Sequence, residues 1–300
     1  MDPRRTRRLT AGGLGLIAAL GCAGMAAAAA EIRVVGSDLL GPDFARAVAE
    51  YSRLNDLAIK LDLTGTRPGA AELAAGRADV ALLLLPPGES VPTAGLTSRV
   101  IGYQVAVVAV SAASPLTQVT TAQLRGMFNA SSGEAFTRWG ELNLIGPWTS
   151  RPIALQALSP SAGLAWPLFQ QVMLNGAAGR PALEFAATTA TLQLRLRATD
   201  NSIAVTGLPP ADWSGLKVLA LAASPSDPAV APTPEQVHRG GYPLRLPLYV
   251  SFRRADAPKL QLFLKFLLTD EAAAALVPAH FLPLPPGVRN QLVFELEEMR

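Results

Sequence analysis

The sequence predicts an α/β fold whose mainly parallel sheets are covered by helices on both faces. Short β-rich apolar segments alternate along the chain with segments of helical periodicity. Residues 79–85 form an almost unbroken apolar run, the pattern of a strand buried inside a parallel sheet. Half of all residues are hydrophobic and 16% are charged, so the composition argues against a disordered chain.

The predicted elements follow one another in the order strand, loop, helix. Each strand is a run of alternating or continuous apolar residues, and each helix repeats apolar residues every three or four positions. We predict strands at 32–36, 59–63, 79–85, 100–110, 152–158, 184–187, 202–207, 218–221 and 246–252. We predict helices through 44–51, in a short segment that ends near 73, and at 120–128, 166–173, 189–198, 259–268 and 272–277. The stretch 235–242 is predicted to be a loop.

Three loops that follow predicted strands share one chemistry. They are Gly36-Ser37-Asp38, Thr64-Gly65-Thr66 and Ser159-Pro160-Ser161. Ligands of open α/β sheets bind at the carboxyl ends of strands, and each loop places hydroxyls and backbone N–H groups at a helix start, where the dipole favours an anion. The alternative is that these residues are ordinary N-caps, because Ser, Thr and Asp are favoured there.

The first 30 residues have the pattern of an export signal. Arginines at positions 4, 5, 7 and 8 precede an apolar run that begins at residue 9, and small residues end the segment. Ala28 and Ala30 suit signal cleavage, so the mature chain is expected to begin at Glu31 and to be periplasmic or secreted. The alternative is an uncleaved membrane anchor, since residues 9–30 are about long enough to span a bilayer. The paired arginines at 7 and 8 are a weak sign of twin-arginine export.

Cys22 is the single cysteine and falls inside this segment. We expect it to be discarded with the signal; the alternative is a lipoprotein acylated at Cys22, but Ala19-Leu20 fits that motif poorly. One Cys and two distant histidines, His238 and His280, leave no disulfide framework and too few ligands for a zinc or iron–sulfur site. We expect no metal and no cofactor.

The charge balance excludes two classes of partner. The chain carries 26 Lys and Arg against 23 Asp and Glu, but the excess lies within residues 1–30, and the rest carries 22 of each sign. Neither a nucleic-acid nor a membrane-surface partner is expected, and local donors must hold any bound anion. No catalytic function is expected either, because the sequence contains neither Gly-x-Ser-x-Gly nor a phosphate loop that ends in Gly-Lys-Ser/Thr.

Several motifs occur in a common order and spacing. They are Val35-Gly36-Ser37, Gly76-Arg77-Ala78-Asp79-Val80-Ala81, Thr121-Ala122-Gln123-Leu124-Arg125-Gly126-Met127-Phe128, Trp139, Tyr242-Pro243-Leu244-Arg245, Phe263-Leu264-Lys265-Phe266 and Phe281-Leu282-Pro283-Leu284-Pro285. Over nearly all of residues 32–286 the chain resembles the periplasmic phosphate-binding proteins of ABC importers and their two-lobed relatives.

The resemblance implies a two-lobed periplasmic-binding-protein-like fold with two hinge crossings. Lobe one would comprise residues 31–105 and 215–300, and lobe two residues 106–214, with ligand held in the cleft between them. It also implies a monomeric, exported solute-binding protein that captures phosphate or a similar small oxyanion. The partner would be an ABC importer membrane complex, or the protein would signal the presence of its ligand.

The resemblance also implies the ligand-binding residues. They are Gly36, Ser37, Asp38, Gly65, Thr66, Arg67, Ser159, Ser161, Ala162 and Gly163. The hydroxyls and the backbone N–H groups beside them are the expected donors. Asp38 either caps the first helix or accepts a hydrogen bond from a protonated oxygen of the anion, and Arg67 either supplies positive charge or is a solvated turn residue.

Three positions depart from the family pattern. Ala157 stands where the family has an arginine, Leu82-Leu83-Leu84-Leu85 replaces a polar segment, and Arg67-Pro68 replaces a glycine-rich turn. An arginine fork is a principal source of bidentate binding to an oxyanion, so its loss weakens the case for tight phosphate binding. The alternative function is a binding-protein-like scaffold or interaction protein without high-affinity phosphate binding, which an apolar cleft would support.

Overall fold

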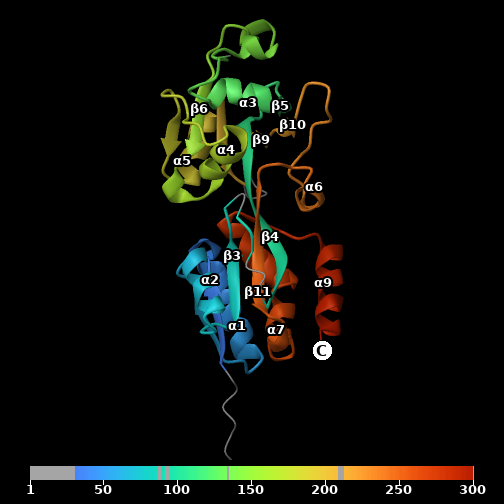
Figure 1. Cartoon of the computed structure of the whole chain (residues 1–300). Helices are drawn as coiled ribbons and strands as arrows, with labels where there is room; N and C mark the ends of the chain where they lie inside the picture. The colour runs from blue at the N-terminus through green and yellow to red at the C-terminus, as the bar shows by residue number, and fades with distance from the viewer. Residues whose placement is uncertain (1–30, 87–88, 92–94, 134, 209–212, 300) are drawn as a thin grey trace, which may run out of the picture. The chain divides into compact units, whose positions relative to one another are not determined.

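The computed structural model describes residues 31–86, 89–91, 95–133, 135–208 and 213–299 (Figure 1). The predicted export signal, with Cys22, lies outside these residues. The strands are β1 (Ile32–Gly36), β2 (Ile59–Asp62), β3 (Val80–Leu84), β4 (Leu96–Ser111), β5 (Gln118–Thr120), β6 (Ala154–Leu158), β7 (Glu184–Ala186), β8 (Ser202–Gly207), β9 (Leu216–Val218), β10 (Ala220–Ala222), β11 (Arg245–Arg253) and β12 (Phe281–Pro283). The helices are α1 (Gly41–Leu54), α2 (Thr66–Ala74), α3 (Thr121–Phe128), α4 (Ala165–Met173), α5 (Thr189–Ala198), α6 (Pro234–Arg239), α7 (Ala257–Phe266), α8 (Asp270–Leu276) and α9 (Pro286–Glu298).

Most of the strands belong to one mixed sheet in the order β2-β1-β3-β11-β4-β8-β6-β7. Two groups of neighbours, β2-β1-β3 and β8-β6-β7, are parallel, as the sequence predicts. The long strands β4 and β11 add antiparallel pairs between these groups. The parallel pairing of β1 with β3 brings their carboxyl ends to the same edge of the sheet, where the predicted ligand loops begin.

Strand β4 changes its partner in mid-course (Figure 1). Its residues up to Val105 pair with β11, and Ala106 to Val110 pair with β8. The predicted end of the first part of lobe one, at residue 105, falls at this change. The division into lobes stays a proposal, and the pairing of β9 with β4 and of β10 with β5 favours an end of lobe two after Ala222 in place of residue 214.

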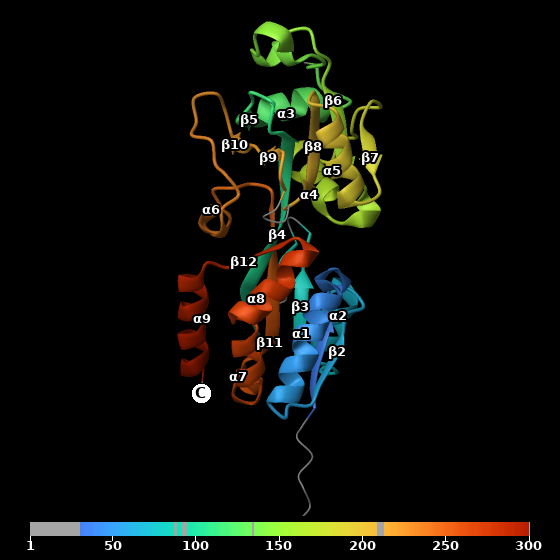
Figure 2. The same cartoon turned by 180° about the vertical axis from the view of Figure 1, so that it is seen from behind.

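Helices pack on the sheet and against one another through buried apolar residues. Phe44 and Val48, one turn apart on α1, are buried, as expected for an amphipathic helix. Helix α1 packs against α8, and α9 packs against α7 (Figure 2). Helix α2 packs on β1 and β3, so the start of α2 is held close to the ends of both strands.

Three expectations about secondary structure are corrected. The strand predicted at 218–221 is two strands, because the chain changes its partner here: β9 pairs with β4, and β10, from Ala220 onward, pairs with β5. The predicted loop at 235–242 contains α6, whose N-cap Thr233 accepts a hydrogen bond from Gln236 N–H. Helix α9 was not predicted, because the exposed Phe294 interrupts its apolar pattern.

Candidate functional site

The loop after β1 is fixed by close backbone packing. Gly36 has a φ of +149°, and a Cβ at this position would lie 2.2 Å from Leu82 O, so no side chain fits. Gly69 on α2 also packs closely, since a Cβ at this position would lie 2.9 Å from Gly36 Cα. Gly65 N–H donates to Gly36 O at 2.8 Å. The two glycine-containing loops are therefore in direct contact through main-chain atoms.

Ser37 lies at the start of the 3₁₀ turn Asp38–Leu40 (η1), which leads into α1. Its side chain is 2% exposed, and its hydroxyl accepts a hydrogen bond from Leu39 N–H at 3.3 Å. Ser37 is thus the N-cap of this turn, which was the alternative interpretation of the loop. Capping uses one lone pair of the hydroxyl oxygen and leaves its O–H able to donate to a ligand.

The predicted site residues of the second loop already have partners inside the protein. The Thr66 hydroxyl accepts from Leu84 N–H at 3.1 Å and donates to Leu84 O at 3.3 Å, which ties the start of α2 to the end of β3. Arg67 Nη2 donates to Glu89 Oε1 at 2.7 Å. The guanidinium that was expected to attract an anion is therefore neutralised locally, although its side chain is 79% exposed.

The third loop forms its own short turn. Ser159 is the N-cap of the 3₁₀ turn Pro160–Ala162 (η4), and its hydroxyl accepts from Ser161 N–H at 3.3 Å. The two serine hydroxyls also lie 2.8 Å apart and hydrogen-bond to each other. Helix α4 begins only at Ala165, and its N-cap residue Leu164 provides no side-chain hydrogen bond. The helix start on this side is thus bordered by an apolar residue.

Two cavities lie beside these loops. Cavity A has a volume of about 580 Å³. Its polar lining residues are Ser37, Asp38, Thr66, Arg67 and Gln171, and its apolar ones are Leu39, Leu84, Pro86, Leu164, Pro167, Leu168 and Leu246. Cavity B has a volume of about 440 Å³, and it shares Asp38 and Leu39 with cavity A.

Cavity B contains residues that the sequence did not indicate. Besides Asp38, the predicted residues Ala162 and Gly163 line it, and so do Gln104 of β4 and His280. Gln104 could have been noticed as the one strongly polar residue in the apolar run 100–110. Of the predicted ligand residues that the structure describes, Gly36, Gly65, Ser159 and Ser161 line neither cavity.

His280 adopts a left-handed backbone conformation, with a φ of +62°, directly before β12. Its ring packs on Gly207, where a Cβ would lie 2.9 Å from His280 Cγ. Its Nδ1 lies 3.0 Å from Leu208 O, and because a carbonyl only accepts, Nδ1 carries the hydrogen. In the tautomer with its hydrogen on Nδ1, the other ring nitrogen is an acceptor.

A comparison with models of protein families identifies the family of this chain. Residues 23–271 match the PBP superfamily domain. The chain belongs to the PBP superfamily. Members of this superfamily are binding proteins and typically not enzymes, and the mixed α/β fold described above is the periplasmic-binding-protein-like fold.

Individual relatives of this PBP superfamily chain are distant. It is 25% identical over 191 residues to the phosphate-binding protein PstS of Pseudomonas aeruginosa, a match that covers 61% of this chain and 58% of the relative's length. A possible phosphate-binding protein from Planctomyces limnophilus has a TM-score of 0.66 at 20% identity, covering 90% of this chain and 98% of that one. PstS from Borrelia burgdorferi has a TM-score of 0.69 at 18% identity, covering 85% and 99%. The solved structures show the common fold.

The departures from the phosphate-binding family are visible in the structure. Ala157, at the position of the expected arginine, is fully buried within β6. Leu82, Leu83 and Leu84 are buried in β3, and Leu84 lines cavity A.

Among the residues that the structure describes, no group of three or more His, Cys, Asp or Glu side chains lies close enough to hold a metal ion. In that part of the chain no helix is both long and apolar enough to cross a membrane.

The motif around Asp79 lies at the other end of β3 from the cavities and has a structural role. The Asp79 carboxylate accepts from Arg33 N–H at 2.8 Å and from Lys259 Nζ at 3.0 Å, and so joins β1, β3 and α7. Burial raises the pKa of the Asp79 carboxyl, but these hydrogen bonds and the nearby cations outweigh it, so the pKa lies below its ordinary value.

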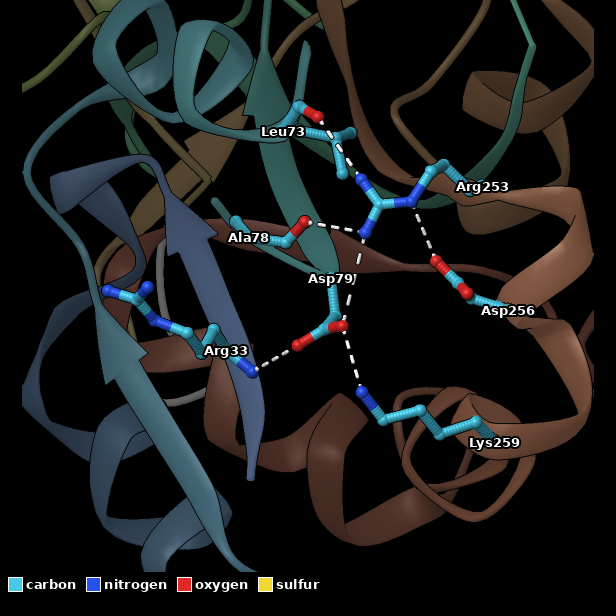
Figure 3. Close-up of polar contacts among 7 residues, drawn as sticks. All are labelled: Arg33, Leu73, Ala78, Asp79, Arg253, Asp256 and Lys259. Atoms are coloured by element: carbon cyan, nitrogen blue, oxygen red, sulfur yellow. Dashed lines mark hydrogen bonds and ion pairs between the residues drawn. The ribbon is translucent and has the colours of Figure 1, made fainter. Parts of the chain in front are cut away.

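Arg253 completes this cluster (Figure 3). Its guanidinium donates to Leu73 O at 3.3 Å, to Ala78 O at 3.1 Å and to Asp256 Oδ2 at 2.7 Å. Leu73 O belongs to the last turn of α2, and carbonyl groups in the last turn of a helix have no partner within the regular helical hydrogen bonding. The cluster therefore anchors α2, whose first residue, Thr66, lines cavity A.

Proposed function

We propose that this chain is an exported solute-binding protein that holds a small ligand in cavities A and B, for delivery to an ABC-type importer or for sensing. Membership of the PBP superfamily supports the binding role, and the distant similarity to phosphate-binding proteins supports the transport context. The main support for the proposal is the lining of cavity A. Loops after β1 and β3, the start of α2 and the start of α4 all contribute to the lining of one cavity of ligand size.

The geometry favours a protein that does not bind phosphate tightly. Charge-assisted hydrogen bonds from cations are the strongest hydrogen bonds that a desolvated anion can accept. Arg67 is the one Lys or Arg among the described residues that line cavity A, and it is paired with Glu89. The Thr66 hydroxyl already has two backbone partners. Most of the remaining lining is leucine and proline.

A second candidate is capture of phosphate or a similar small oxyanion. The buried hydroxyl of Ser37, which lines cavity A, favours it, because its O–H can donate to an anion. The names of the relatives favour it as well. This candidate requires the Arg67 side chain to leave Glu89 when the anion enters.

Isothermal titration calorimetry separates the two candidates. We would express the full chain with its own N-terminal segment, purify it from the periplasm of a bacterial host, and titrate it with phosphate, sulfate, molybdate and small carboxylates. The proposal expects phosphate to bind weakly, if heat is detected, with a Kd no tighter than about 100 μM, equivalent to about −5.5 kcal/mol. A submicromolar Kd for phosphate would establish the second candidate. A protein that responds to no solute in a broader thermal-shift screen would instead be a scaffold or interaction protein.

A further inference from the structure

The two cavities share a wall at Asp38 and Leu39 but differ in chemistry. Cavity A presents the side chains of five leucines and two prolines. Cavity B presents Asp38, Asp43, Gln104 and His280 among its lining residues, and these described lining residues include no Lys or Arg. An apolar compartment therefore borders a compartment without fixed cationic side chains.

Gln104 is the clearest indication of a ligand in cavity B. Its side chain is 5% exposed, and its Oε1 atom is buried without a hydrogen-bond partner in the described part of the chain. A buried acceptor that lacks a donor destabilises the protein, and such groups are rare in native structures. Gln104 lines cavity B, so a turn of its side-chain amide would present this oxygen to a ligand that brings a hydrogen-bond donor into the cavity.

The other polar groups of cavity B are also acceptors. The Asp38 carboxylate forms no hydrogen bond or ion pair with any other residue that the structure describes. Asp43 is paired with Arg46. His280 uses the hydrogen of Nδ1 on Leu208 O, which leaves its second nitrogen as an acceptor. Asp38, Gln104 and His280 thus offer acceptors to a ligand, and Asp38 also offers an unpaired negative charge.

We propose that the ligand is a small organic ammonium compound with an apolar body. The ammonium group donates to the Asp38 carboxylate and to Gln104 Oε1, and the apolar body lies among the leucines of cavity A. This inference rests on the proposed solute-binding function and names the chemical class of the solute. An ammonium group suits the site because it has three donors and no acceptor, while a phosphate would meet the Asp38 carboxylate with like charge.

Two probes that share one apolar body test the assignment. We would titrate the full chain, purified from the periplasm, with pentylammonium chloride, sodium pentanoate and sodium phosphate at equal ionic strength and neutral pH. Pentylammonium is expected to bind at least about tenfold more tightly than pentanoate, because only its head group supplies donors to the charged acceptor. Pentanoate or phosphate binding as tightly as pentylammonium would overturn the assignment.

Substitutions identify the residues involved. Asp38→Asn is expected to weaken pentylammonium binding by about tenfold or more, while the control Asp62→Asn, which makes the same charge change at a residue that lines neither cavity, leaves it unchanged. Gln104→Leu should weaken binding severalfold without lowering the thermal midpoint of the unliganded protein, because it removes an unsatisfied buried acceptor. A reduced midpoint with unchanged affinity would instead give Gln104 a purely structural role and contradict the proposal.

The outcomes also separate this inference from the function on which it rests. If phosphate or another solute binds and pentylammonium does not, the ammonium assignment is wrong and the solute-binding function stands. If neither these three probes nor any solute of a broad thermal-shift screen binds, both are wrong.

Discussion

Arg67 Nη2 lies 2.7 Å from Glu89 Oε1, so the one cationic side chain of cavity A among the described residues is held by a carboxylate from the segment after β3. Both side chains are substantially exposed, and pairs of this kind contribute only about 0–1 kcal/mol to stability. The pair matters more for ligand choice than for folding, because it determines whether a positive charge faces the cavity.

Removing this carboxylate should restore affinity for anions. We expect Glu89→Gln to tighten phosphate binding by about five- to tenfold in calorimetry, since the freed guanidinium can form charge-assisted hydrogen bonds. The matched control is Glu72→Gln, because Glu72 holds Arg77 in a similar ion pair at residues that line neither cavity. If Glu89→Gln has no more effect than Glu72→Gln, Arg67 does not contribute to binding.

The Asp79 cluster should give a measurable pH dependence of stability. Its carboxyl has a lowered pKa in the folded protein, so the charged form stabilises the fold at neutral pH, and this contribution is lost as the pH falls below about 4. Asp79→Asn is expected to lower the free energy of unfolding by about 1–2 kcal/mol at pH 7, because it removes the charge that faces Lys259.

Urea unfolding followed by circular dichroism checks the sign of this effect. The difference between wild type and Asp79→Asn should shrink as the pH is lowered from 7 to 3, since in this range the carboxyl of the unfolded chain takes up its proton before that of the folded protein does. The exposed Asp227→Asn serves as the control and should change stability little at either pH. A difference that is the same at both pH values would show that the charge of Asp79 plays no part.

The regular elements were predictable because their signals are local. The repeated order of strand, helix and strand placed α5 at 189–198 and β8 at 202–207, with the bounds that the structure has. Helix α9 was not predicted because one of its large apolar residues, Phe294, is exposed and interrupts the pattern of a single apolar face. The strand β12 was not predicted because three residues are too few to show a periodicity.

The candidate site was less predictable, because its chemistry depends on contacts between distant residues. The sequence indicated Ser37, Asp38, Thr66 and Arg67 as ligand-binding residues; they line cavity A, and their role in binding stays a prediction. It could not show that Glu89, 22 residues away, forms an ion pair with Arg67. Nor could it show that the Thr66 hydroxyl forms hydrogen bonds with the main chain of Leu84. These pairings arise only when the strands are assembled, and they change the expected ligand.

The predicted export signal leads to a prediction about the mature protein. Intact-mass spectrometry of the protein recovered from the periplasm should give a chain that begins at Glu31, because Ala28 and Ala30 supply the small residues that signal cleavage requires. Replacing both alanines by leucine should leave the uncleaved chain in the membrane fraction. A mature chain that begins at Cys22 and carries lipid would contradict this prediction and identify a lipoprotein.

The closest main-chain approach beside the site should be intolerant of any side chain. Gly36→Ala forces a Cβ to within 2.2 Å of Leu82 O, at a backbone φ that side chains rarely adopt. Strain and overpacking together are expected to lower stability by about 3 kcal/mol or more, which corresponds to a fall in Tm of roughly 6–12 °C for a chain of this size. Gly287→Ala is the control: its Cβ meets no atom within 4 Å, and an alanine in the first turn of α9 should leave Tm unchanged or raise it. If the Tm of Gly36→Ala were the same as that of the wild type, β1 and β3 would have to separate without loss of stability. The positions of Ser37 and Thr66 at the cavity would then not depend on this contact.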